Sequence, residues 1–178
     1  MWIGKQTITK LHDSLLHKTN YLSSGFQLTF SFCNPDPATY IQLFKIWQNS
    51  MPKLANVGGI YVEFLVQPHP VTNGTNLFGL QAGKTDDIMV DMTSAYTNKA
   101  DDTLVIQVLT DIVNQQKQLL KKSNYLIDFL YLNYADISQQ VLQSWGSSNV
   151  NKLRAASEKY DPSGVFQTQV PGGFKIPK

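Results

Sequence analysis

Phe26-Gln27-Leu28-Thr29-Phe30-Ser31-Phe32 is the stretch that decides the fold class, because apolar and polar side chains alternate along it without a break. Successive side chains of a β-strand point to opposite faces of the sheet. The alternation therefore predicts a strand with one apolar face and one polar face. The segment 34–37, Asn-Pro-Asp-Pro, ends this strand.

Further elements are predicted on the C-terminal side of this strand. A helix is expected from about residue 38 to residue 55, a strand over 60–66, a loop over 68–76, and a strand from 88 to about 97. A long helix follows, with Asp101 and Asp102 in its first turn and lysines near its last, charges that complement the helix dipole. Residues 1–24 show only a weak helical period.

The last third of the chain predicts two more elements. Residues 129–134 have the composition of a short aromatic strand, and a helix is expected over 149–160 with Ser148 as its N-cap, ended by Asp161-Pro162. The tail beyond contains no regular period. Because strands and long helices alternate unevenly, the predicted class is α+β, an antiparallel sheet flanked by helices.

Composition excludes several classes of protein. The chain has 178 residues, 42% of them hydrophobic, with 15 basic against 13 acidic residues. A single arginine, Arg154, argues against a nucleic-acid binder, and a single cysteine, Cys33, excludes an internal disulfide framework. No apolar run reaches the roughly 18 residues of a membrane-spanning helix, so no membrane span is expected. The first residues lack the apolar core of a signal peptide.

Short motifs that suggest chemistry have simpler interpretations. Residues 83–85, Gly-Lys-Thr, lack the glycine spacing of a phosphate-binding loop and predict a lysine-bearing turn between strands. The histidines His12, His17 and His69 have no metal-ligand spacing, so no metal site is expected. Residues 73–75, Asn-Gly-Thr, form a glycosylation acceptor pattern that matters only in the secretory route.

Two tyrosines and an asparagine in the predicted aromatic strand are the candidate functional residues. In a regular strand Tyr131, Asn133 and Ala135 face one way, and Leu132 and Tyr134 face the other. Buried tyrosine hydroxyl groups need hydrogen-bond partners, and tyrosines near strand ends often line pockets. From physical chemistry alone, packing in the core is favoured over a catalytic role.

A set of motifs in order along the C-terminal third resembles the C-terminal end of fungal FAD-linked oxidases of the berberine-bridge-enzyme-like group. These motifs are Asn133-Tyr134-Ala135-Asp136, Trp145-Gly146, Lys159-Tyr160-Asp161-Pro162, Gly164-Val165-Phe166-Gln167 and Pro171-Gly172-Gly173-Phe174. Upstream, the resemblance to the family's substrate domain is looser. The order of the motifs is far more specific than any one of them.

The resemblance implies a domain organisation. Full-length members have an N-terminal FAD-binding domain, a substrate domain with a large antiparallel sheet, and a C-terminal segment that returns to the flavin domain. By this resemblance, residues 1–128 are a partial substrate-binding α+β domain, and residues 129–178 are the berberine-like C-terminal segment. The FAD-binding domain has no counterpart, and His12, His17 and Cys33 do not occupy the contexts of the residues that tether the flavin.

The resemblance also implies roles for three residues. Tyr134 matches the tyrosine that several members use as a general base, Asn133 the asparagine close to the flavin, and Tyr131 an aromatic residue that lines the substrate pocket. The implied reaction oxidises an alcohol-type carbon of a small-molecule substrate, with hydride transfer to FAD and oxygen as the final acceptor.

Because the FAD-binding domain is missing, the chain is expected to be inactive alone and to need that domain as a partner. The alternative is a truncated, non-catalytic binding or interaction module derived from the same family. Relatives are often secreted, but this chain shows no signal, so its compartment stays open.

Overall fold

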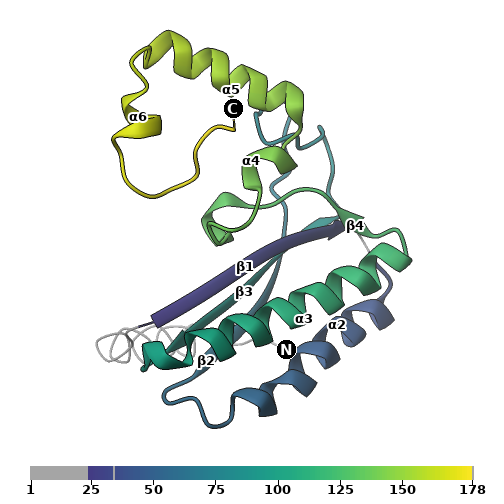
Figure 1. Ribbon diagram of the computed structural model, residues 1–178. Coiled ribbons are helices and arrows are strands. Elements are labelled where there is room, and N and C mark those ends of the chain that lie inside the picture. Colours follow the sequence, from purple (N-terminus) through teal and green to yellow (C-terminus); the bar gives the residue numbers. More distant parts are fainter. Residues whose placement is uncertain (1–23, 34, 178) are drawn as a thin grey trace, which may run out of the picture.

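A four-stranded antiparallel sheet forms the centre of the computed structural model, which describes residues 24–33 and 35–177 (Figure 1). The strands are β1 (Ser24–Cys33), β2 (Tyr61–Pro68), β3 (Asp87–Tyr96) and β4 (Leu126–Ile127), and their order in the sheet is β2-β3-β1-β4. The predicted α+β class is confirmed, as are the first three strands. The weak helical period, His12, His17 and Asn34 lie outside the described residues.

Two long helices, α2 (Pro37–Ser50) and α3 (Asp102–Lys122), cover one face of this sheet, α2 running on into a 3-10 turn, η1 (Met51–Leu54). Helix α2 begins where the sequence predicts, because the Asp36 carboxylate accepts a hydrogen bond from the Thr39 amide at 2.9 Å and Pro37 occupies the first turn. A second 3-10 turn, η2 (Lys99–Asp101), leads into α3.

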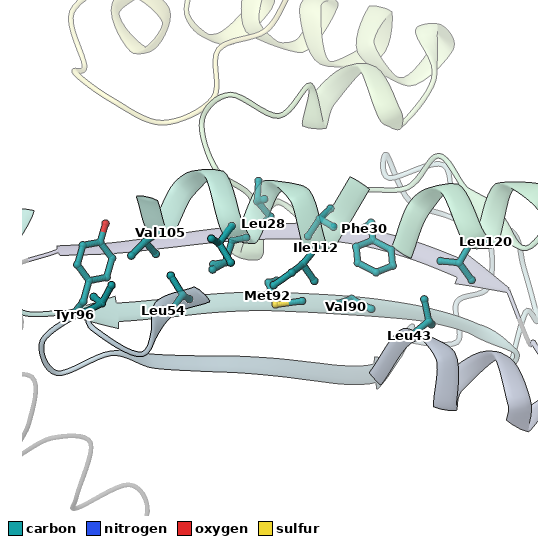
Figure 2. Close-up of a cluster of buried hydrophobic side chains, with 14 of the residues drawn as sticks. Leu28, Phe30, Leu43, Leu54, Val90, Met92, Tyr96, Val105, Ile112 and Leu120 are labelled. Carbon is teal, nitrogen blue, oxygen red and sulfur yellow. The ribbon is translucent and has the colours of Figure 1, made fainter. Parts of the chain in front are cut away.

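The main core lies between this face and the two helices. The apolar face of β1 supplies Leu28, Phe30 and Phe32, all nearly inaccessible to water, and α3 covers them with its apolar stripe (Figure 2). Burying a side chain of this size contributes roughly 1.5–3 kcal/mol. Inside the helical layer, the Gln116 side chain donates to the Leu43 carbonyl oxygen at 2.9 Å, which fixes α3 against α2.

The C-terminal segment lies on the other side of the sheet from α2 and α3, and it has a small core of its own (Figure 1). Its elements are η3 (Leu132–Tyr134), α4 (Val141–Ser144), α5 (Ser147–Tyr160) and α6 (Val165–Thr168). Phe129, Val141, Leu142 and Trp145 are buried together there, and Leu80 from the β2–β3 loop packs against them. The domain boundary between residues 128 and 129 stays a prediction.

The structure corrects three expectations in this segment. Residues 129–134 are not a strand: β4 is only two residues long, and the chain then turns to bury Phe129 in the second core. Ser148 is not the N-cap of α5. The N-cap is Gly146, and its φ of 89° is one that glycine tolerates. The tail also contains the short helix α6, whose first amides donate to the Asp161 carboxylate at 2.9 Å.

Candidate functional site

The three residues singled out from the sequence lie together on the turn η3. A 3-10 turn brings residues three apart onto the same side, and the rings of Tyr131 and Tyr134 accordingly meet edge to face, with centroids 5.0 Å apart and planes at 83°. The Asn133 amide donates to the Tyr131 hydroxyl oxygen at 3.0 Å. The predicted alternation, with Tyr131 and Tyr134 on opposite faces, is therefore wrong, because it assumed an extended strand.

The turn rests on the polar face of the sheet, opposite α2 and α3. Tyr134 donates its hydroxyl hydrogen to Gln67 Oε1 at 3.0 Å, a bond from the C-terminal segment to the edge strand β2. Gln27 of β1 donates from Nε2 to the carbonyl oxygen of Asn133 at 3.2 Å. These two bonds place Tyr134 over the sheet, between the side chains of β1 and β2.

Carboxylate and amide side chains fill the polar face beneath the turn. The strand register puts Thr93 of β3 directly between Gln27 of β1 and Glu63 of β2. Asp91, two residues along β3, is only 8% exposed, and its carboxylate accepts from the Thr93 hydroxyl at 2.9 Å. A carboxylate that is buried on a central strand does not serve packing, and such groups are concentrated at functional sites.

The electrostatics of this face raise the pKa of Asp91 and that of Tyr134. Burial raises the pKa of Asp91, and the nearby Glu63 carboxylate raises it further, against the hydrogen bond from Thr93. Burial is also the main reason that the pKa of Tyr134 is raised, followed by the charge of Asp91, while the bond to Gln67 acts in the other direction. Within the described residues, no cation lowers the pKa of Tyr134.

An open cavity of about 350 Å³ adjoins the turn. Its walls come from β1, β3 and the residues that follow η3, and they include Gln27, Thr93 and Ile137. Polar groups line the sheet side, and Ile137, which is 65% exposed, lies on the opposite wall. The space suits a small molecule with both polar and apolar parts.

The sequence indicated the three residues of the turn, although as part of a strand, and it did not indicate the side chains that they contact. Gln27 and Thr93 are ordinary polar positions of alternating strands, and Gln67 lies at the end of a strand in a stretch without any motif. Asp91 gave the one usable signal, since it is a charged residue in the middle of an apolar strand pattern. Its proximity to Tyr134 depends on contacts between residues far apart in the sequence.

The other candidate motifs stay apart from this site. The Gly83-Lys84-Thr85 segment is a turn that leads into β3, as predicted, and Lys84 pairs with Asp86 at 3.9 Å. His69 is buried, with its Nε2 atom 3.1 Å from the Ser31 hydroxyl oxygen and its ring 4.8 Å from that of Phe129. Among residues 24–33 and 35–177, no three potential metal-ligating side chains come together. None of the helices described there is long and apolar enough to cross a bilayer.

Comparison with known proteins identifies relatives for this arrangement. Residues 130–170, which include the η3 turn, match the family model for berberine and berberine-like proteins. The chain is 42% identical over 106 residues to the FAD-dependent monooxygenase drtC of Aspergillus calidoustus, covering 60% of this chain and 20% of that protein. It is 34% identical over 137 residues to the FAD-dependent monooxygenase sdcF of Emericella nidulans, covering 72% and 29%.

A third relative is the bifunctional solanapyrone synthase of Alternaria solani, which is 28% identical over 148 residues and covers 79% of this chain. No solved structure matches. The chain spans 20% to 29% of the length of these three relatives. It therefore belongs, as a partial counterpart, to the berberine-bridge-enzyme-like group of fungal FAD-linked oxidoreductases.

Proposed function

We propose that this chain is the substrate-binding and C-terminal part of an FAD-dependent oxidase that oxidises an alcohol-type carbon. The observation that carries the proposal is the η3 turn, which holds Tyr131, Asn133 and Tyr134 together over a polar sheet face. The relatives named as FAD-dependent support the cofactor. An open cavity beside the turn offers room for the substrate.

FAD, when bound, accepts a hydride from the substrate carbon. Among the described residues, Asn133 is the one proposed to contact this cofactor. Its side chain is exposed on the turn next to the two tyrosines and would lie against the flavin ring, on the side that faces the substrate. The sequence has no glycine cluster with the spacing that wraps a diphosphate. We therefore expect the remainder of the cofactor to be held by an FAD-binding domain, and the isolated chain to be colourless and inactive.

Tyr134 is the residue that takes the hydroxyl proton from the substrate. Its hydroxyl group is already ordered by the bond to Gln67, and the ring of Tyr131 lies edge to face against its ring. A general base must lose its own proton first, and here burial and the charge of Asp91 raise the pKa of Tyr134. Because no cation among the described residues lowers this pKa, we expect the FAD-binding domain to supply one in the working enzyme.

The exposed apolar side chains of the C-terminal segment are the surface proposed to meet that domain. Phe166 is 65% exposed and Val165 and Val170 lie open beside it, whereas Tyr131, Tyr134 and Phe174 are half-buried. The proposed surface therefore consists of the exposed side chains on and just after α6, whereas the three half-buried aromatic side chains already pack within the chain. Contiguous apolar surface of this kind marks interaction sites.

The test is complementation of this chain with the FAD-binding domain of a relative, followed by measurement of flavin reduction under single-turnover conditions. Tyr134→Phe keeps the ring and removes the oxygen, so the rate should fall by roughly 10²–10⁴, which is about 3–5 kcal/mol of transition-state stabilisation. Tyr131→Phe should cost much less. Tyr125→Phe, on the helix-side core, is the matched control and should leave the rate unchanged.

A rate within about twofold of the parent for a folded Tyr134→Phe variant would refute the catalytic role. In that case the alternative, a non-catalytic binding module derived from the family, gains support. The raised pKa of Tyr134 favours this alternative, because it disfavours the phenolate that a general base requires.

A further inference from the structure

Along most of its length, strand β1 has no neighbouring strand on the side opposite β3. Its neighbour β4 pairs with it only at Ser31 and Phe32. Two residues earlier, Thr29 is completely buried, so its backbone amide and carbonyl on that side have no access to water. Buried peptide groups without a partner are costly, and a further strand residue would normally supply one.

The side chain of Gln139 takes the place of the missing strand. The Thr29 amide donates to Gln139 Oε1 at 3.0 Å, and Gln139 Nε2 donates to the Thr29 carbonyl oxygen at 2.8 Å. A carboxamide carries one donor and one acceptor side by side, as a peptide group does. The two residues are 110 positions apart in the sequence, so this pair joins the sheet to the C-terminal segment.

The same carboxamide also holds the segment that follows Tyr134. Gln139 Oε1 accepts a second hydrogen bond from the Asp136 amide at 3.3 Å, just beyond the η3 turn. On the other side of Tyr134, the Asn133 carbonyl oxygen is held by Gln27. The turn is thus fixed to β1 both before and after the tyrosine.

We infer that Gln139 is a positioning residue that sets the place of Tyr134 over the polar sheet face. The inference rests on the proposed function for its catalytic meaning, although the contacts themselves do not depend on it. No other side chain offers the same pair of groups at this reach: asparagine is one methylene shorter, and glutamate has no donor for the Thr29 carbonyl.

The experiment uses the 178-residue chain labelled with ¹³C in its tyrosine rings, in parent form and as Gln139→Ala, Gln139→Glu and Gln140→Ala. NMR would follow hydrogen exchange of the Thr29 amide and the pH titration of the Tyr134 ring. In Gln139→Ala, exchange should be roughly tenfold faster, the equivalent of about one hydrogen bond. Tyr134 should titrate closer to the pH of an exposed tyrosine, because the released ring is hydrated.

Gln139→Glu keeps the acceptor for both amides and should lie between the parent and Gln139→Ala, which maintains a test if the alanine variant fails to fold. Gln140→Ala changes an exposed neighbour and should behave as the parent. Faster Thr29 exchange with an unchanged Tyr134 titration would reduce Gln139 to a structural role, and no change in either would refute the contact. Neither NMR measurement involves flavin. A negative result here therefore bears on the role of Gln139, whereas an unchanged rate for Tyr134→Phe in the complemented enzyme bears on the proposed function.

Discussion

The two faces of β1 carry residues of opposite kinds. Towards α2 and α3 the strand presents Phe30 and its apolar neighbours, which pack in the main core. Towards the C-terminal segment it presents Gln27 and Thr29, and the adjacent strand adds the buried Asp91. Both faces are largely covered, yet only one resembles an ordinary protein interior.

The difference separates what stabilises the chain from what the site requires. Apolar burial on the helix side contributes favourable free energy in proportion to area. On the other face, the carboxyl group of Asp91 is buried, and burial raises its pKa because the charged form is disfavoured there. Such features cost stability and persist where function needs them.

The largest expected effect is on the helix side. Phe30→Ala leaves a cavity beneath α3 and should lower the free energy of unfolding by about 3–5 kcal/mol. Chemical denaturation followed by circular dichroism measures this change. Phe166→Ala is the matched control, because the same side chain is 65% exposed on α6 and its loss should stay within about 0.5 kcal/mol. Equal effects would contradict the assignment of the core.

A glycine substitution tests how the C-terminal segment is held to the other face. Gly79 in the β2–β3 loop has a φ of 77°, and an added Cβ would lie 2.8 Å from the Trp145 carbonyl oxygen. Gly79→Ala should destabilise by about 2–3 kcal/mol, from backbone strain and overlap together. Gly83 has a φ of 69° and open space around it, so Gly83→Ala should lower the free energy of unfolding by only about 1 kcal/mol. Thermal unfolding of both variants would show whether the overlap matters.

A substitution on the polar face should have the opposite sign. Asp91→Asn keeps an oxygen for the Thr93 hydroxyl and removes the buried charge, so the free energy of unfolding at pH 7 should rise by about 1 kcal/mol. The pKa of Asp91 is higher in the folded chain than in the unfolded chain. The stability that the protonated carboxyl group contributes is therefore fully present below the unfolded-state pKa, and it is lost as the pH rises through the folded-state pKa. The advantage of the variant should therefore vanish near pH 3. A destabilised variant at pH 7 would show that the carboxylate supports the fold.

The smallest effect concerns the pH dependence caused by His69. Burial lowers the pKa of His69, only partly offset by the charge of Asp87. A lowered pKa gives stability that is present above the unfolded value of 6.5 and is lost as the pH falls. Between pH 7.5 and 5, the parent should lose more stability than His69→Gln, measured by urea denaturation at each pH. Parallel pH profiles would mean that His69 is protonated without cost.

Much of the fold was predictable because its signals are local. The alternation of residues 26–32 and the charged ends of the long helix predict β1 and α3, and both are present. The strand expected over 129–134 failed for a physical reason: aromatic and apolar residues of the second core have the composition of a strand, although they are buried by a turn. For the site, the sequence indicated Tyr131, Asn133 and Tyr134 but none of the side chains that receive them.

The sequence by itself determined that β1 has one apolar face for a core and one polar face. The reason is local: successive side chains of a strand point to opposite faces, so the alternation of residue types fixes both. Tertiary structure alone decided what the polar face meets. The bonds from Tyr134 to Gln67 and from Gln139 to Thr29 join residues 67 and 110 positions apart. No local pattern encodes such pairs, since they form only when the C-terminal segment folds over the sheet and buried backbone groups must find partners.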